Sequence, residues 1–379
     1  MKSSFPLFRK PRGGPDKYRA MALELRRRIL CGEFPPGTRL PTRAKLCATL
    51  RTNAVTLQKA MNLLVKQGLI RAAGARGTFV ADPALAPRHY ALAFPWPRQE
   101  DTSQFYRALR QQAKQLTTPH RQITCFDEIS GHTDTEDYLR LAGLVRAHRL
   151  SGIIFASIPF LVEGLPVLEE PGVPRAMIAE PTTQFSVPSV YPDLAGFWVR
   201  AFDEFAAAGR RRVAVITLTL PGDPGARLDK LFELAAARGL QIQRSRVQAV
   251  PLTTPYWAQH AAELLFQAGP TARPDALLIT DDNLVPAATA GVRAAGVRAP
   301  EDVLVIAHTN FPYPTLAAVP VTRLGYDISQ LLALCVERID RQRRGEVPAA
   351  STLLPVVFEE EFAGLRMTGQ PAERAGVTL

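Results

Sequence analysis

The chain has 379 residues, of which 46% are hydrophobic and 21% are charged. This length suits two or three domains, and this composition excludes wholesale disorder. No run of about 18 apolar residues occurs, and residues 1–17 lack the apolar core of a secretory signal, so we expect a cytoplasmic protein without a membrane segment. The net charge is +11, and residues 1–90 hold 18 of the 46 Lys and Arg residues but 4 of the 35 Asp and Glu residues. Because cations that neutralise phosphates release counterions, this N-terminal excess favours nucleic-acid binding.

Motifs of catalysis and metal binding are missing from the sequence. The four cysteines form no CxxC pair, and the six histidines show no metal-ligand spacing. No glycine-rich phosphate loop, nucleophile elbow or convincing acid–base pair is present. We therefore expect no catalytic residue, no metal and no cofactor.

The N-terminal segment has the pattern of three helices followed by a hairpin. Apolar spacing predicts a helix over 18–31, and Thr42 can cap a second helix that ends near Leu50. After a turn at 51–53, capped by Thr52 or Asn53, a third helix is expected over 54–67. Gly68 ends that helix, and strands at 69–71 and 77–80 form a hairpin. The side chains expected to be buried by the third helix are Val55, Leu57, Ala60, Met61, Leu64 and Val65.

Two short helices with a sharp bend, followed by a hairpin, make a winged helix-turn-helix, which places one helix in a DNA groove. The order and spacing of the segments 36–41, 56–60, 68–70 and 76–80 resemble the DNA-binding domain of the GntR family of bacterial repressors. The resemblance implies binding to double-stranded operator DNA. The residues that we expect to contact DNA are Arg43, Lys45, Thr52, Asn53, Thr56, Gln58, Lys59, Arg76 and Gly77.

Particular side chains suit particular DNA contacts. Thr56 can donate to a phosphate or touch a base edge, and Gln58 can pair with adenine in the major groove. Arg76, at the tip of the hairpin, can enter the minor groove or grip a phosphate. The family often has arginine where this chain has Ala44, Ala54 and Gln58, so the family's usual operator sequence is not expected to carry over.

From His89 onward, strand-like and helical runs alternate, which predicts βαβ units and parallel sheets in two lobes. The fold class is therefore α/β: an N-terminal winged helix-turn-helix domain followed by a two-lobed α/β domain of the periplasmic-binding-protein kind. The expected division is a flexible basic arm (1–15), the helix-turn-helix domain (16–81), a linker (82–88), the two-lobed domain (89–365) and a tail (366–379).

Several phrases of the second part resemble the effector domain of the LacI/GalR repressors, which has a periplasmic-binding-protein fold. They lie at 150–154, 190–193, 206–214, 225–228, 274–282 and 296–307. The whole chain thus resembles the arabinose-repressor type, with a GntR-like head on a LacI/GalR-like body. The resemblance implies a small sugar-like effector and a homodimer.

Ligands of such sheets bind outside the carboxyl ends of the parallel strands. Arg227 matches the family's ligand-contacting arginine, and Asp193 and Asp282 match family acids. An aspartate is usual near Thr309, so either Asn310 takes its role or the ligand is not a typical monosaccharide. The expected effector contacts are Phe94, Trp96, Gln104, Phe105, Asp193, Arg227, Asp282 and Asn310.

The leading hypothesis is a transcriptional repressor whose operator affinity is controlled by a ligand in the cleft of the body. A second hypothesis is a regulator whose body serves only for dimerisation. An aminotransferase-like enzyme would need a Schiff-base lysine, and after residue 90 there are only Lys114 and Lys230, both on helical surfaces by pattern. A solute-binding transport protein is disfavoured by the basic head and the missing signal peptide.

Overall fold

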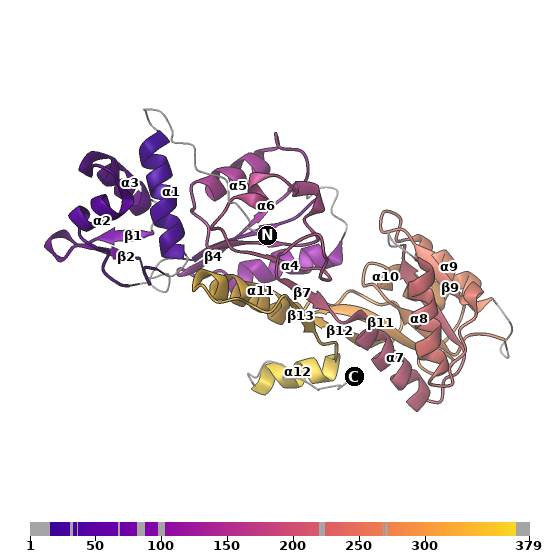
Figure 1. Cartoon of the computed structure of the whole chain (residues 1–379). Coiled ribbons are helices and arrows are strands. Elements are labelled where there is room, and N and C mark those ends of the chain that lie inside the picture. The colour runs from indigo at the N-terminus through magenta and orange to yellow at the C-terminus, as the bar shows by residue number, and fades with distance from the viewer. Residues whose placement is uncertain are drawn as a thin grey trace, which may run out of the picture.

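A computed structural model describes residues 16–30, 33–35, 37–66, 69–81, 88–97, 103–219, 224–267, 269 and 272–368. The predicted arm at 1–15 lies outside the described residues, as do residues 82–87 of the predicted linker and 369–379 of the predicted tail. Within the described part the chain forms a small N-terminal head and a larger body of two lobes arranged one after the other (Figure 1).

The head is a three-helix unit with a two-stranded hairpin, as the sequence predicts. Its elements are α1 (Asp16–Leu30), α2 (Arg43–Leu50), α3 (Ala54–Lys66), β1 (Ile70–Ala72), a short 3-10 turn (Gly74–Arg76) and β2 (Thr78–Val80). The apolar faces of the three helices meet in one core, to which Leu25, Leu57 and Leu64 contribute fully buried side chains. Among the described residues, this core contains none from the body.

The predicted burial of Val55 and Val65 is wrong. These side chains are 66% and 42% exposed. Helix α3 packs against α1 and α2 with one face, to which Leu57, Ala60, Met61 and Leu64 belong. Val55 lies on the opposite face together with Lys59 and Asn62, both exposed.

The first lobe of the body, the N-lobe, is a six-stranded parallel sheet in the order β13-β7-β6-β5-β3-β4. Its strands are β3 (Arg88–Ala93), β4 (Arg121–Phe126), β5 (Gly152–Phe155), β6 (Arg175–Met177), β7 (Ser189–Pro192) and β13 (Ser351–Leu354). Its helices are α4 (Gln104–Leu116), α5 (Glu136–Arg146), α6 (Pro166–Glu169) and α11 (Ile328–Arg343), with a 3-10 turn at Phe160–Val162.

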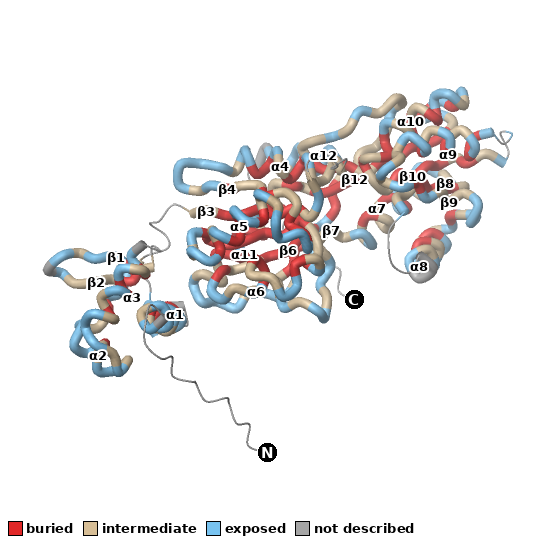
Figure 2. Tube along the Cα trace, turned by 90° about the horizontal axis from the view of Figure 1, so that it is seen from above, coloured by how far each residue is buried: buried red, intermediate tan, exposed pale blue. Residues whose placement is uncertain are grey.

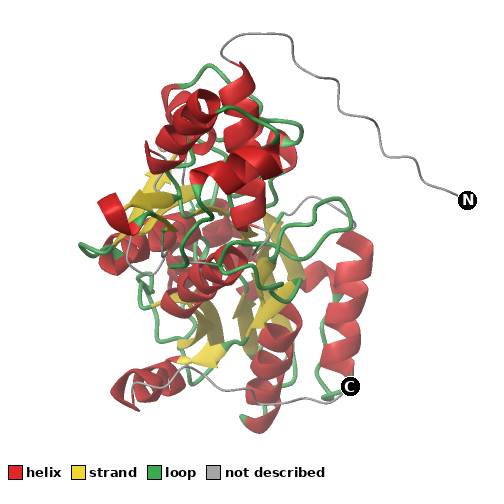
Figure 3. Ribbon diagram, turned by 60° about the vertical axis from the view of Figure 1, so that its left-hand side comes forward, coloured by secondary structure: helices red, strands yellow, loops and turns green. Residues whose placement is uncertain are grey.

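The second lobe, the C-lobe, has a six-stranded sheet in the order β14-β12-β11-β10-β8-β9, parallel except for the β12–β14 pair. Its strands are β8 (Val213–Leu218), β9 (Val247–Val250), β10 (Ala276–Ile279), β11 (Leu304–Phe311), β12 (Thr322–Asp327) and β14 (Val357–Phe358). Helices α7 (Leu194–Ala207), α8 (Pro224–Ala236), α9 (Trp257–Phe266) and α10 (Val285–Ala294) flank this sheet (Figure 3), and a 3-10 turn spans Arg244–Arg246.

The chain passes between the lobes at 192–194, 327–328 and 354–357. One apolar cluster runs through both lobes, and each lobe has a further cluster of its own; buried segments accordingly follow the strands of both sheets (Figure 2). Helix α12 (Glu359–Thr368) follows the last passage. The acidic run Glu359–Glu361 forms its first turn, and the predicted boundary between body and tail falls inside this helix.

Candidate functional site

The first turns of α2 and α3 are each held by a side-chain cap. The Thr42 hydroxyl accepts a hydrogen bond from the backbone N–H of Lys45 at 3.4 Å, and the Asn53 carboxamide accepts one from the N–H of Thr56 at 2.8 Å. Each cap satisfies an amide that a helix N-terminus leaves free. Asn53, rather than Thr52, is therefore the cap of α3. Arg51 ends α2 in the left-handed region at φ 47°, which turns the chain sharply into α3.

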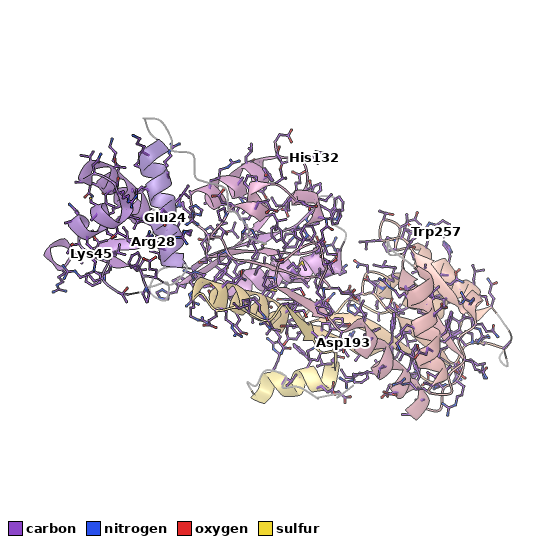
Figure 4. The ribbon with its side chains drawn as sticks, in the orientation of Figure 1. Glu24, Arg28, Lys45, His132, Asp193 and Trp257 are labelled. Atoms are coloured by element: carbon purple, nitrogen blue, oxygen red, sulfur yellow. The ribbon has the colours of Figure 1, made fainter. Side chains whose placement is uncertain are left out.

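The predicted DNA-contacting side chains of α2 and α3 are at the surface. Arg43, Lys45, Asn53 and Lys59 are exposed, whereas Thr52, Thr56 and Gln58 are half-buried. The Gln58 carboxamide donates to the Asn62 side chain at 2.7 Å. Helices α2 and α3 lie on the side of the head away from the body, and Lys45 lies at this outer edge (Figures 1 and 4). Among the residues that the structure describes, no side chain of the body covers this end of the head in the pictured arrangement.

The hairpin beside these helices depends on Gly77. Its φ is 101°, and a Cβ built there would lie 2.7 Å from Nε of Arg39. Only glycine adopts this backbone region without strain. Arg39 forms an antiparallel bridge with Phe79, so the segment around Arg39 lies alongside the hairpin. Arg76 is exposed at the tip, as predicted.

Both sheets of the body are wound so that one pair of neighbouring strands has connections leaving in opposite directions. In the N-lobe, β3 leads to β4 on one side, and β5 lies on the other side of β3. In the C-lobe, β8 leads to β9, and β10 lies on the other side of β8. Ligands of open α/β sheets bind at the carboxyl ends of such strands.

At this position the N-lobe has a cavity of about 250 Å³. Ala93 ends β3 and Phe155 ends β5, and both line the cavity. Most of its other lining side chains are apolar or aromatic: Pro95, Trp96, Tyr106, Ile129, Ser157, Ile158, Pro159, Phe160 and Leu161. The side chains of Trp96 and Phe160 are 53% and 55% exposed, so aromatic faces are available there to a ligand.

The corresponding edge of the C-lobe is polar. The Thr280 hydroxyl donates to the Thr217 hydroxyl at 2.8 Å, which joins the ends of β10 and β8. Asp281 accepts from both the backbone and the side-chain amide of Asn283, at 2.9 Å and 2.6 Å. The Asn283 carboxamide oxygen accepts from the backbone N–H of Gln104 at 2.8 Å. Because Gln104 begins α4, this bond ties the ligand edges of the two lobes together.

Asp282 and Asn310 meet beneath that edge. The Asn310 carboxamide donates to Asp282 at 2.7 Å, and each residue is 1% exposed. His308 lies 3.9 Å from the Asp282 carboxylate. Burial, together with the charge of Asp281, raises the pKa of Asp282 from 3.8 to about 7. Burial also lowers the pKa of His308.

The other predicted effector contacts are placed differently. Phe94 is fully buried, with the Arg110 guanidinium 3.6 Å from its ring centroid and Tyr106 packed edge-on. The expectation that the Phe94 ring lines the ligand site is therefore corrected: it supports Tyr106 from below. Phe105 is half-buried and packs on the apolar cluster that joins the lobes, and it does not line the cavity.

Asp193 is a helix cap that lies where the chain passes between the lobes (Figure 4). Its carboxylate accepts from the N–H of Gly196 at 2.8 Å, and its carbonyl accepts from the Tyr326 hydroxyl at 3.0 Å. Arg227 is exposed near the start of α8. The structure therefore groups Trp96 with the cavity, Gln104 with the polar edge, and Asp282 with Asn310. Sequence reasoning missed Tyr106, Phe160, Thr217, Thr280 and Asn283.

The described residues contain no group of three His, Cys, Asp or Glu side chains that could hold a metal ion. No helix among them has the length and apolarity needed to cross a membrane. Lys114 and Lys230 are exposed, and Lys230 pairs with Glu233 at 3.2 Å. Neither lysine lies in a pocket where a Schiff base would be sheltered.

Comparisons with known proteins divide the chain in the same way. Residues 17–80 match the bacterial regulatory proteins of the gntR family, and residues 202–359 match the periplasmic binding protein-like domain. Over 69 residues the chain is 39% identical to the uncharacterized HTH-type transcriptional regulator YdeF of Bacillus subtilis. That match spans 18% of this chain and 15% of that relative.

Solved structures resemble the body of the chain. A LacI family transcriptional regulator from Lactobacillus casei with bound glucose has a TM-score of 0.54 at 18% identity, over 72% of this chain and 98% of that one. A regulatory protein of the LacI family from Chloroflexus aggregans has a TM-score of 0.55 at 19% identity, over 71% and 96% of the two chains. At these identities the likeness shows a shared two-lobed fold.

Proposed function

We propose that this transcriptional regulator, which joins a GntR-type DNA-binding head to a periplasmic-binding-protein-like body, is a repressor controlled by a sugar or related polyol. The observation that carries the proposal is the pairing of an outward-facing, basic helix-turn-helix with a body that has a cavity at the switch point of its first sheet. The matches to a DNA-binding domain family and to a periplasmic binding protein-like domain support a regulator.

In this proposal α3 is the reading helix. Thr56 and Gln58 contact base edges or phosphates near its start, and Lys59 contacts a phosphate. Val55, missed as a contact, adds an exposed apolar side chain that suits the methyl group of thymine. Arg43 and Lys45 of α2 and Arg76 of the wing then neutralise further phosphates.

The ligand would lie between the aromatic cavity of the N-lobe and the polar edge of the C-lobe. Trp96 and Phe160 offer faces on which an apolar ring face can stack. Across the lobes, Thr217, Thr280 and Asp281 offer hydroxyl and carboxylate groups for a polyol. Glucose bound to the Lactobacillus casei regulator supports a ligand of this class.

Repression would require a homodimer whose two heads fit a palindromic operator. A ligand that favours one arrangement of the lobes would change the relation of the two subunits, and with it the spacing of the heads. The affinity for ligand and the affinity for DNA are then linked by one coupling free energy.

Thermal unfolding against sugars, sugar acids and polyols tests the ligand proposal, because a ligand of the folded state raises the midpoint with concentration. Tryptophan fluorescence then locates the bound compound. The signal change should disappear in Trp96→Phe and persist in Trp257→Phe, which alters an exposed tryptophan on α9 (Figure 4). A panel without a stabilising compound, or a signal that follows Trp257, would count against this site.

A further inference from the structure

One side chain of the head reaches the body. Arg26 is on α1, and its guanidinium Nη2 donates to the backbone carbonyl of Pro171 at 3.1 Å. Pro171 lies two residues after α6 of the N-lobe. Helix α1 is the helix of the head that lies beside the N-lobe (Figure 1). The bond therefore joins the DNA-binding unit to the body independently of the peptide chain.

The burial of Arg26 is unusual for its place in the sequence. It is 4% exposed, whereas the side chain of the adjacent Arg27 is 61% exposed. Helix α1 buries Ala22, Leu25 and Ile29 in the core of the head, and Arg26 flanks that face. A fully buried arginine is uncommon unless something pairs with it, so the burial of Arg26 points to a surface that covers it.

The surface that receives Arg26 is built to hold guanidinium groups. The segment 166–171 of the N-lobe also wraps Arg175, whose guanidinium donates to the carbonyls of Val167 and Glu170 at 3.1 Å and 2.9 Å. The carboxylate of Glu170 favours the charge of Arg26, although burial lowers the pKa of Arg26 to about 10. Glu170 itself lies 3.7 Å from the His148 ring, at the end of α5.

The body does not satisfy every hydrogen-bond donor of Arg26. Nε of Arg26 is buried without a hydrogen-bond partner among the described groups, and a buried donor left unpaired costs free energy. The head and the body also have separate apolar cores. A contact of this kind fixes an orientation while remaining easy to break.

We propose that Arg26 is a positioning residue that docks the DNA-binding head on the N-lobe at Glu170–Pro171 and so sets the orientation of the reading helix relative to the body. This inference rests on the proposed function for its consequence: two docked heads in a dimer select one spacing between operator half-sites. The docking itself is a property of the chain alone.

Arginine modification of the full chain tests the docking. Phenylglyoxal, read out by peptide mass spectrometry, should modify Arg26 at least about tenfold more slowly than Arg27, because a docked state populated ten to one gives that protection. Glu170→Lys places a positive charge beside Arg26 without altering the head, and should bring the two rates together. Glu169→Lys alters an adjacent, exposed carboxylate and should leave Arg26 protected.

Two results would overturn the docking. Equal modification of Arg26 and Arg27 in the unaltered chain would show that no surface covers Arg26. Protection that survives Glu170→Lys would contradict docking at Glu170–Pro171. This experiment needs no DNA, so it decides the docking even if the proposed function fails.

Operator spacing tests the consequence. In duplexes whose half-sites are separated by increasing numbers of base pairs, the unaltered chain and Arg27→Ala should prefer the same spacing. Arg26→Ala should bind the other spacings almost as well, because its heads are no longer fixed. A spacing preference retained in Arg26→Ala would contradict the positioning role, whereas failure of all three proteins to bind DNA would count against the proposed function.

Discussion

The Asn310 carboxamide donates to the Asp282 carboxylate at 2.7 Å, and the two side chains lie buried beneath the polar edge of the C-lobe. Both residues are among the effector contacts that the sequence predicts. In the structure they bond to each other, whereas Thr217, Thr280 and Asp281 of the polar edge are half-buried. Asp282 then positions Asn310 and the end of β10, and the stability of the fold depends on whether its carboxyl group is protonated.

Stability should fall as the pH rises through the titration of Asp282. Its pKa is about 7 in the folded protein against 3.8 for a free carboxyl. Between these values the folded state holds a proton that the unfolded chain releases, so the free energy of unfolding decreases with rising pH, by at most about 4 kcal/mol. Asp282→Asn keeps the acceptor for Asn310 and should abolish this decrease.

Urea unfolding of both proteins from pH 5 to pH 8 measures the difference. His308 contributes with the opposite sign, because its lowered pKa makes stability rise with pH up to about 6.5. Comparing the variant with the unaltered chain removes most of this contribution. Parallel pH profiles for the two proteins would show that Asp282 is ionised in the folded state.

Operator preference should be lost when the start of α3 is altered. Thr56→Ala combined with Gln58→Ala removes the hydroxyl and the carboxamide that we assign to base readout, and leaves the buried side chains of α3 in place. Binding to a selected operator should fall to the level of random DNA while the unfolding midpoint changes little. Thr253→Ala, on an exposed loop of the body, is the control. Unchanged sequence preference would refute α3 as the reading helix.

The wing should contribute through charge rather than sequence. Arg76→Ala removes an exposed cation from the tip of the hairpin. We expect weaker binding to all duplexes and a salt dependence of log K that is shallower by about one unit. Arg19→Ala removes an exposed cation from α1 and should leave the slope as it is. Equal slopes for Arg76→Ala and the unaltered chain would mean that the wing does not reach a phosphate.

The stability of the body should depend on a buried tyrosine in its first strand. Tyr90 on β3 is fully buried, and its hydroxyl donates to Asp340 on α11 at 2.7 Å. Asp340 also pairs with Arg88. Tyr90→Phe should destabilise the protein by about 1–2 kcal/mol in denaturant unfolding, because Asp340 loses a buried donor. Tyr256→Phe, at an exposed position, should change nothing measurable. No loss of stability in Tyr90→Phe would mean that water replaces the hydroxyl.

Much of the fold can be predicted from local sequence patterns such as helix caps, turn residues and apolar runs. Thr42, Asn53 and Gly77 mark helix starts and a turn, and the apolar runs of β3, β8 and β10 mark buried parallel strands. The alternation of strands and helices predicts the two lobes, as the structure confirms. These signals act within a few residues, so the sequence alone reveals them.

Other features depend on contacts distant in the chain. Strands β7, β12, β13 and β14 are short or carry polar residues, so their own sequences mark them only weakly as strands. They form because neighbouring strands pair with them at the passage between the lobes. Val55 fits the apolar pattern of a buried helix position, yet it is 66% exposed. Likewise, the burial of Phe94 under Arg110 and the mutual satisfaction of Asp282 and Asn310 follow only from the packed structure.

The most direct test of the central claim is the affinity of the full chain for an operator selected from random duplexes, measured with and without the polyol that most raises its unfolding midpoint. The account predicts a palindromic operator whose affinity falls when the ligand is added, by the same factor by which DNA weakens ligand binding. An affinity that the bound ligand leaves unchanged would contradict the account, because head and body would then act independently.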